Sequence, residues 1–350
     1  MRKFGIRRVL ALGLALVAVG YPLAPGQAEA NGVSCSEVRI PVTLAVLPLL
    51  PQTMFGRLCV PDGAATVQVL IPGGSYTSSY WDLPADRGLF SFRAAMNEAG
   101  YATLTVDRLG TGRSSKPLSV LLTTFTDAAV MHQVVGRLRS GALGHRFAKV
   151  IIGGHSLGAS ISVIEAANYQ DVDGVLLAAL THHLDLVDSA ADGLLSFYPA
   201  TVDPLLAKRL PDPGYLTTEP GTRYQAFHNP GQPVAGAIDF DESTKDVFAA
   251  TEAADAIGVS IMSPYSILIN APVLVTLGGQ DELFCSPLPI ATDCSSAEAL
   301  RQQEAPFYNP NARLRTYLLP GSYGHSFNFA PNAAEFATAA ARWADELVGR

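Results

Sequence analysis

Charge is scarce in this 350-residue sequence, and no basic block stands out in it. Only 16% of the residues are charged, against about 25% in an average soluble domain, whereas 48% are hydrophobic. Disordered chains combine high charge with low hydrophobicity, so this composition excludes disorder. The formal net charge is −7. A nucleic-acid partner would need clustered Lys and Arg instead, so we expect none.

Repeats, low-complexity tracts and cofactor fingerprints are missing as well. Neither of the glycine turns at 73–74 and 110–112 has the Gly-x-Gly-x-x-Gly form followed by a ribose-binding acid. We therefore expect no cofactor. A chain of this length can bury a large core, as one big domain or as a domain with an insertion.

Residues 1–30 have the form of a secretory signal peptide. Four basic residues open the chain: Arg2, Lys3, Arg7 and Arg8. The apolar run at 9–21 that follows is too short for a membrane-spanning helix, which needs roughly 20 such residues. Ala28-Glu29-Ala30 then supplies small residues two positions apart, as signal cleavage requires. An uncleaved signal anchor is the alternative.

Cleavage before Asn31 removes the four basic residues and one acidic residue, so the net charge becomes more negative by three. We expect a secreted protein, extracellular or periplasmic, without a membrane span after cleavage. Four cysteines remain: Cys35, Cys59, Cys285 and Cys294. An even number in an oxidising compartment indicates disulfides. We favour Cys35–Cys59 and Cys285–Cys294 because each pair closes a short loop, and no Cys-x-x-Cys or nearby His supports the rival zinc site.

Short β-branched runs alternate along the chain with longer amphipathic stretches, which predicts βαβ units and a mostly parallel sheet, that is, an α/β fold. Strands are expected at 38–43, 55–60, 66–71, 102–106, 149–153, 174–180, 272–277 and 313–318, the first two antiparallel. Helices are expected at 88–99, 126–140, 157–168 and 331–348. Thr126 is the expected N-cap of the second helix, and Gly141 its expected end.

The alternation stops between 184 and 268, a stretch with many Pro and Gly, scattered aromatic residues and a helical pattern at 245–256. Roughly 85 residues are too many for a structureless loop in a compact domain. We therefore expect a mainly helical cap at 184–268, inserted between a first part of the core at 31–183 and a second part at 269–350. A looser lid with little regular structure is the alternative.

The strongest chemical signal is Gly154-His155-Ser156-Leu157-Gly158, a Gly-x-Ser-x-Gly pattern between an expected strand and an expected helix. The glycines permit a tight turn that lifts the Ser156 hydroxyl above the sheet edge. The same turn places a helix N-terminus, with its free N–H groups, beneath the reacting carbonyl. The pattern predicts a nucleophilic serine.

Three features together resemble the α/β-hydrolase superfamily over nearly all of the mature chain: GHSLG at 154–158, DRLGTGRS at 107–114 and PGGS at 72–75. The second is similar to the branch that contains haloperoxidase-like esterases and epoxide hydrolases. The resemblance implies a mostly parallel central sheet flanked by helices. In that branch an Asp nucleophile would imply epoxide or haloalkane chemistry, whereas Ser156 implies acyl transfer through an acyl-enzyme.

A nucleophilic serine needs a base and a carboxylate that orients the base. The family order of Ser, acid and His implies His325, because it alone among the seven histidines lies beyond the last expected strand. The resemblance implies Asp281 as the acid, in a Gly-x-x-Asp that follows the strand at 272–277. Glu282, one residue on, and Asp185, after the preceding strand, are the alternatives.

The resemblance also implies two N–H donors for an oxyanion. Leu157, directly after the nucleophile, supplies one. The other comes from Gly74 or Ser75, and the choice stays open because the family often has His-Gly where this chain has Pro72-Gly73. Two residues are expected to form walls of the site: Tyr76 and His182. A metal-binding role for His182-His183 lacks the carboxylate–histidine spacing of a metal site.

These features predict a secreted, cofactor-independent, lipase-like serine esterase that cleaves a carboxylic ester, lactone or thioester. Low charge and the aromatic residues of the cap favour a small, largely apolar substrate. An acyltransferase or cyclising thioesterase with the same triad is one alternative. A ligand-binding protein that keeps the hydrolase fold is another, and a peptidase is a minor third. Nothing in the sequence indicates an oligomeric state.

Overall fold

The structure is a computed structural model that describes residues 27–29, 32–45, 49–185, 197–209, 212–261, 265–286, 288 and 290–350. Residues 1–26 and 30 of the predicted signal peptide lie outside the described residues, so its cleavage stays a prediction. Its residues 27–29 form β1 (Gln27–Glu29), which pairs antiparallel with Val33–Cys35 at the start of the next strand. No helix among the described residues has the length and hydropathy needed to cross a bilayer.

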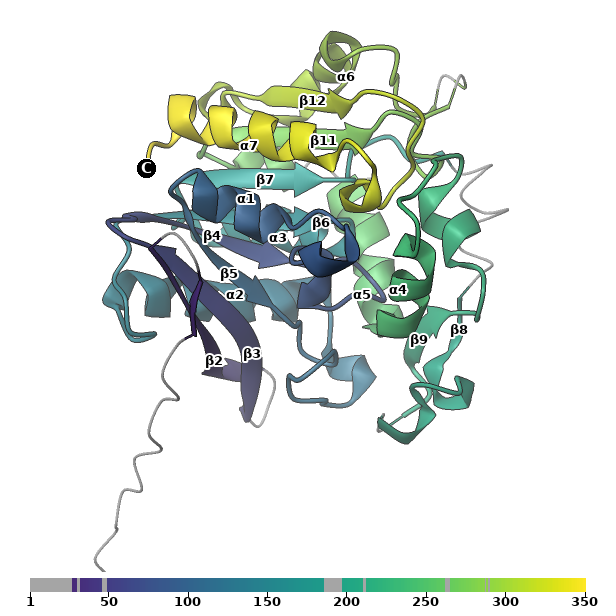
Figure 1. Cartoon of the computed structure of the whole chain (residues 1–350), viewed down its shortest axis with the longest axis horizontal. Coiled ribbons are helices and arrows are strands. Elements are labelled where there is room, and N and C mark those ends of the chain that lie inside the picture. Colours follow the sequence, from purple (N-terminus) through teal and green to yellow (C-terminus); the bar gives the residue numbers. More distant parts are fainter. Residues whose placement is uncertain are drawn as a thin grey trace, which may run out of the picture.

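A single large sheet runs through the molecule, with its strands in the order β1-β2-β3-β5-β4-β6-β7-β11-β12 (Figure 1). The remaining strands of this sheet are β2 (Val33–Leu44), β3 (Leu50–Pro61), β4 (Thr66–Ile71), β5 (Ala102–Val106), β6 (Lys149–His155), β7 (Gly174–Ala178), β11 (Val273–Gly278) and β12 (Arg315–Leu319). Strands β1, β2, β3 and β5 pair antiparallel, and every pairing from β5 to β12 is parallel. The expected α/β class and the antiparallel opening pair are confirmed.

Helices cover both faces of the parallel part, so its central strands are buried along their length. Every residue of β4 and of β11 is buried. The helices of the sheet domain are α1 (Phe92–Glu98), α2 (Thr124–Ser140), α3 (Leu157–Tyr169), α6 (Ala297–Glu304) and α7 (Ala333–Leu347). Helices α1 and α7 pack together through stacked Phe92 and Phe336, whose ring centroids lie 4.9 Å apart. These two helices contribute to one cluster of buried hydrophobic residues, and helices α2 and α3 contribute to a second, larger one.

Short helical turns connect these elements: η1 (Ser78–Tyr80), η2 (Ala85–Arg87), η3 (Ser119–Leu121), η10 (Tyr265–Leu268), η11 (Ala305–Phe307), η12 (Pro310–Ala312) and η13 (Phe327–Phe329). The helix expected at 88–99 begins later, at Phe92, because the side chain of Ser91 accepts the Ala94 N–H as an N-cap. Helix α6 was not predicted.

The expected N-cap of α2 is wrong. Helix α2 begins at Thr124, and Thr123 is its N-cap. The Thr123 hydroxyl accepts the Thr126 N–H at 3.1 Å, while the Thr126 hydroxyl accepts the Thr123 N–H at 2.9 Å. The two threonines thus satisfy each other's backbone donors as a capping box, which the sequence pattern alone did not distinguish from a single cap at Thr126. Gly141 ends the helix in the left-handed conformation, with φ 81°, as predicted.

The segment between β7 and β11 forms a separate layer beyond the carboxyl ends of the parallel strands (Figure 1). Its described helical elements are α4 (Ala237–Thr244), α5 (Ala250–Asp255), η6 (Ala200–Val202), η7 (Ala207–Arg209), η8 (Tyr224–His228) and η9 (Ala256–Ile261). A small antiparallel sheet of β8 (Phe197–Pro199), β9 (Tyr215–Thr218) and β10 (Phe248–Ala249) was not predicted. The helix expected at 245–256 is wrong in its first part, because Phe248 and Ala249 pair with β9. The expected domain boundaries, with a cap at 184–268 and core parts at 31–183 and 269–350, stay a prediction.

Both expected disulfides are present. Cys35 and Cys59 face each other across β2 and β3, so their bridge ties together two strands that already pair. Cys285 and Cys294 close the loop that follows β11. Two disulfides are consistent with a protein that folds in an oxidising compartment.

Helix α3 carries a carboxyl group inside the core. Glu165 is completely buried, and Asp171 lies beside it. Burial, a hydrogen bond to Asp171 and the negative charge of Asp171 raise the pKa of Glu165 to about 10. The Glu165 carboxyl group is therefore protonated at neutral pH in the folded protein but ionised in the unfolded chain. Its contribution makes the folded state less stable as pH rises from about 4.5 toward 10.

We expect Glu165→Gln to stabilise the protein at pH 8 by about 1–3 kcal/mol, because the neutral amide needs no proton uptake on folding. The gain should vanish near pH 4.5, where the unfolded carboxyl group is itself largely protonated. Urea unfolding at both pH values measures this difference. Glu98→Gln, on the exposed surface of α1, is the control and should give no such pH dependence. An equal destabilisation by Glu165→Gln at both pH values would contradict the protonated state.

Candidate active site

Ser156 lies at the apex of a tight turn between β6 and α3. Its backbone has φ 53° and ψ −118°, a conformation that a non-glycine residue rarely adopts. A Cβ atom on Gly154 would overlap the backbone of Gly158, and one on Gly158 would overlap the Ile71 carbonyl group. Both glycines are therefore required by close backbone contacts. The Ser156 N–H donates to the Ala178 carbonyl oxygen at 2.8 Å, which fixes the turn to β7.

His325 and Asp281 come from two loops that the sheet brings together. Asp281 lies three residues beyond the end of β11, and His325 lies in the loop between β12 and α7. The His325 Nδ1–H donates to the Asp281 carboxylate at 2.9 Å, and both side chains are buried. The other carboxylate oxygen of Asp281 accepts the Leu283 N–H at 3.1 Å. The structure thus brings together the acid and the base that the resemblance implied.

The alternative acids have other contacts. The Glu282 carboxylate accepts from the Asn229 side-chain amide at 2.7 Å. Asp185 is completely buried, and its backbone N–H donates to the Leu283 carbonyl oxygen at 2.9 Å. The carboxylate at hydrogen-bond distance from His325 is that of Asp281.

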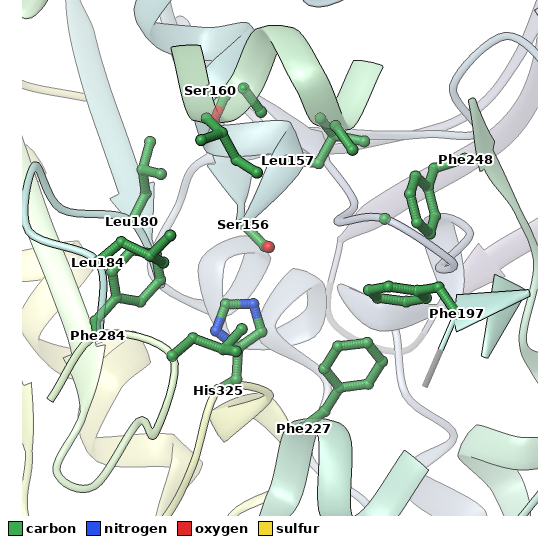
Figure 2. Close-up of a pocket in the computed structure, with 15 residues that line it drawn as sticks. Ser156, Leu157, Ser160, Leu180, Leu184, Phe197, Phe227, Phe248, Phe284 and His325 are labelled. Carbon is green, nitrogen blue, oxygen red and sulfur yellow. The ribbon is translucent and has the colours of Figure 1, made fainter. Parts of the chain in front are cut away.

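Ser156 and His325 line one cavity of about 140 Å³, and the Ser156 hydroxyl points toward the His325 ring (Figure 2). The other lining residues are Gly74, Leu157, Ser160, Leu180, Leu184, Phe197, Phe227, Phe248, Ala253, Ala256, Ile257, Leu283 and Phe284. No Asp, Glu, Lys or Arg is among these described residues. The cavity therefore presents an apolar wall to whatever group reaches Ser156.

Two of the three expected oxyanion donors, Leu157 and Gly74, line the same cavity as Ser156. Leu157 is the first residue of α3, so its N–H has no acceptor inside the helix. Gly74 lines the cavity, and a Cβ atom on it would lie 3.8 Å from the Leu157 side chain. Ser75 is completely buried and is not part of the cavity wall. The geometry favours Gly74 over Ser75 as the second donor.

The structure places the two expected wall residues, Tyr76 and His182, outside the cavity lining. Tyr76 is buried beneath the site, where its hydroxyl group lies 2.7 Å from the Ser326 hydroxyl and 3.2 Å from the Asp241 carboxylate. His182 points away from the cavity, because its Nδ1 lies 2.7 Å from the Glu304 carboxylate and its ring stacks on Phe307. Neither residue lines the cavity. Polar partners outside the site hold both side chains.

His155, inside the serine motif, makes a contact that sequence reasoning missed. Its ring is buried and stacks on Tyr80, with ring centroids 4.1 Å apart. Its Nε2 lies 3.0 Å from the His325 carbonyl oxygen. Burial, followed by the neighbouring charge of His325, lowers the pKa of His155 well below its usual range. The neutral ring donates from Nε2–H and so holds the backbone of the residue that faces Ser156.

Buried charged residues hold the loop that follows β5. Asp107 accepts the Ser78 and Arg113 N–H groups at 2.9 and 2.8 Å. Its neighbour Arg108 forms a buried ion pair with Glu252 of α5 and donates to the Gly73 carbonyl oxygen at 3.3 Å. Nothing in the sequence marked Glu252 as its partner, because the two residues are 144 positions apart.

One cluster of possible metal ligands occurs among the described residues. His132, Glu165 and Asp171 each place one ligand atom within 4.8 Å of the others. The cluster lies near the C-terminal end of α3, whereas Ser156 precedes its N-terminal end. The His132 Nδ1 and an Asp171 carboxylate oxygen are 2.7 Å apart, a hydrogen-bond distance. This cluster is separate from the cavity at Ser156.

Comparison with known proteins agrees with this geometry. The model of a family described as the alpha/beta hydrolase family matches residues 68–341. The chain belongs to the alpha/beta hydrolase family. The fold and the family that the serine motif suggested are confirmed, and membership supports a hydrolase. Compared with curated protein sequences, the chain has no match.

Solved structures show the same fold at low sequence identity. A thermophilic esterase from Thermogutta terrifontis is 16% identical with a TM-score of 0.54, over 88% of this chain and 98% of the esterase. A bacterial membrane phospholipase A is 15% identical with a TM-score of 0.57, over 90% of this chain and 87% of the phospholipase. A probable hydrolytic enzyme from Pseudomonas aeruginosa PAO1 is 17% identical with a TM-score of 0.54, over 87% of this chain and 93% of that enzyme.

We expect His155→Phe to lower kcat about 10-fold for the hydrolysis that family membership supports and to destabilise the protein by about 1–3 kcal/mol. The phenyl ring keeps the stacking on Tyr80 but leaves the buried His325 carbonyl oxygen without its donor. Steady-state kinetics and thermal unfolding measure the two effects. Because His155 is neutral, the pH profile of kcat/KM should keep its shape in the variant. A lost or displaced inflection would show that His155 titrates during turnover.

Proposed function

We propose that the protein is an exported serine hydrolase that cleaves a carboxylic ester, lactone or thioester through an acyl-enzyme on Ser156. The observation that carries the proposal is a shared cavity, in which Ser156 at the apex of its turn faces the ring of His325 (Figure 2). Asp281 accepts from the other ring nitrogen, Nδ1. Geometry of this kind is how Ser–His–Asp sites are recognised on unrelated folds.

In the proposed first step, the Ser156 hydroxyl oxygen attacks the substrate carbonyl carbon while His325 Nε2 takes the hydroxyl proton. Asp281 keeps Nδ1 protonated and stabilises the imidazolium ion that forms. The N–H groups of Leu157 and Gly74 donate to the oxyanion of the tetrahedral intermediate. The alcohol leaves with the proton from His325. Water then repeats the sequence on the acyl-enzyme and releases the acid and the free serine.

The cavity supports a small, largely apolar substrate. Its volume is about 140 Å³, and its described lining holds six large aliphatic or aromatic side chains from the segment between β7 and β11: Leu180, Leu184, Phe197, Phe227, Phe248 and Ile257. A sugar or a charged peptide group would lose its hydration there without gaining polar partners. An uncharged acyl or alcohol group of few atoms fits this surface best.

Export of the protein is part of the proposal. The two disulfides support it, together with the basic start and small-residue cleavage motif of residues 1–30. The compartment is extracellular or periplasmic.

We expect a fluorophosphonate probe to label the purified protein at one site, and Ser156→Ala to abolish labelling and lower kcat for an aryl ester at least about 1,000-fold. Mass spectrometry of the labelled protein locates the site. Ser160→Ala, also on the cavity wall, is the matched control and should still be labelled. A wild type that takes no label, or labelling that survives Ser156→Ala, would contradict the proposed function. Turnover with added alcohol or amine separates hydrolysis from acyl transfer.

We expect Phe197→Ala to shift acyl preference toward longer chains, raising kcat/KM for a long ester relative to a short one about 10-fold. Phe197 packs edge-to-face on Phe248 at 4.8 Å and forms one wall of the cavity, so its removal enlarges the site. A panel of p-nitrophenyl esters of increasing chain length measures the shift. Phe125→Ala, on the exposed side of α2, should leave the preference unchanged. An unshifted profile for Phe197→Ala would mean that the acyl group binds elsewhere.

A further inference from the structure

A buried cation links the segment between β7 and β11 to the active site. Arg223 precedes η8 and is completely buried. One guanidinium nitrogen lies 2.8 Å from the Asp241 carboxylate, in α4. The other terminal nitrogen donates to the Ser75 hydroxyl at 2.9 Å. The planar fork of arginine, unlike the point charge of lysine, can hold two such partners at once.

Ser75 belongs to the turn that carries Gly74. Its φ is 60°, an unusual value for a residue with a side chain. Two contacts hold it there: Arg223 binds its hydroxyl, and the Asp246 N–H donates to its carbonyl oxygen at 2.8 Å. The guanidinium carbon of Arg223 also lies 4.3 Å from the centre of the Tyr76 ring. The position of the Gly74 N–H therefore depends on contacts from outside its own turn.

Asp241, the partner of Arg223, reaches the loop of the catalytic histidine. Its carboxylate accepts from the Tyr76 hydroxyl at 3.2 Å and lies 2.7 Å from the His228 ring. The Tyr76 hydroxyl lies 2.7 Å from the hydroxyl of Ser326, directly after His325. Burial raises the pKa of Asp241, but the charge of Arg223 and the hydrogen bond from His228 outweigh burial and lower it to about 2. The carboxylate is thus ionised throughout the neutral range.

We propose that Arg223 and Asp241 are positioning residues: their ion pair holds the turn of Gly74 and the loop of His325 in register with each other across the cavity. The inference rests on the proposed function, since it assigns these residues a part in the same reaction. Neither residue lines the cavity or touches substrate. They act through Ser75 on the oxyanion side and through Tyr76 and Ser326 on the side of the base.

This role differs from a purely structural one in its kinetic signature. When a hydrogen-bond donor is displaced from the oxyanion, the transition state is stabilised less, whereas binding of the substrate in the ground state is almost unchanged. Misplacement by about 1 Å can cost about 100-fold in rate. Substitutions of Arg223 or Asp241 should therefore lower kcat rather than raise KM. An aryl boronic acid forms a tetrahedral adduct with serine, so the variants should bind it more weakly, in proportion to their loss in kcat.

The test compares two isosteric variants of buried aspartates. Asp241→Asn weakens the link to both catalytic loops. Asp203→Asn breaks a matched buried pair, because Asp203 binds Lys245 at 2.7 Å and touches neither loop. We expect Asp241→Asn to lower kcat for an aryl ester about 10- to 100-fold with KM changed less than about threefold. Asp203→Asn should destabilise the protein similarly but keep kcat per folded molecule.

Ser75→Ala removes a single hydroxyl group and leaves the ion pair and the backbone N–H groups in place, so it serves even if Asp241→Asn does not fold. It should lower kcat about 10-fold, and the combination with Arg223→Lys should add little to the larger single effect, because both changes remove the same contact. Equal kcat values for Asp241→Asn and Asp203→Asn, or an unchanged kcat in Ser75→Ala, would overturn the positioning role. A wild type without ester hydrolysis would instead overturn the proposed function, and this inference with it.

Discussion

The active site depends on one close approach between backbones, where the start of α3 passes over the end of β4. Gly158 lies so near the Ile71 carbonyl group that no side chain fits between them. This contact places the N-terminus of α3 beside the turn that follows β4. Ser156, Leu157 and Gly74 all line the cavity as a result. The positive φ of Ser156 is the local cost of this arrangement, and the parallel strands on both sides of β6 sustain it.

The proposed base, His325, and its proposed acid, Asp281, are held by different means. Asp281 follows a strand buried on both faces, so the sheet fixes its position directly. His325 lies in a loop, and its backbone is held from below by His155, within the serine motif itself. The segment after β11 and the loop of His325, which is bound to the turn of Ser156 through His155, thus meet at the hydrogen bond between His325 and Asp281. The proposed reaction needs both groups in register, and the contacts of His155 with the His325 backbone and of Leu283 with Asp281 support that register.

Sequence reasoning located the elements whose burial is continuous and the residues that follow a fixed chain order. Strand β4 was predicted at its observed bounds because it is rich in β-branched and apolar residues, and it is buried throughout. Asp281 and His325 followed from family order, although 44 positions separate them. Failures occurred where a contact distant in sequence decides the outcome. Phe248 joins a strand because β9 is there to pair with it, and Tyr76 turns into the protein because Asp241 is there to accept its hydroxyl.

Although charged residues are few in this chain, some of them form buried ion pairs close to the cavity. Two completely buried ion pairs lie in or against the segment between β7 and β11: Arg223 with Asp241, both within that segment, and Arg108 with Glu252, which joins it to the loop after β5. Such pairs contribute little net stability, since desolvation offsets their attraction. A misplaced segment would leave Arg108 and Glu252 buried and unpaired, and it would move Arg223 away from the Ser75 hydroxyl. Apolar contacts could hold the segment at many nearby positions, whereas these polar contacts form at one. The buried ions therefore select a single seating of the segment over Ser156, and that seating defines the shape of the cavity.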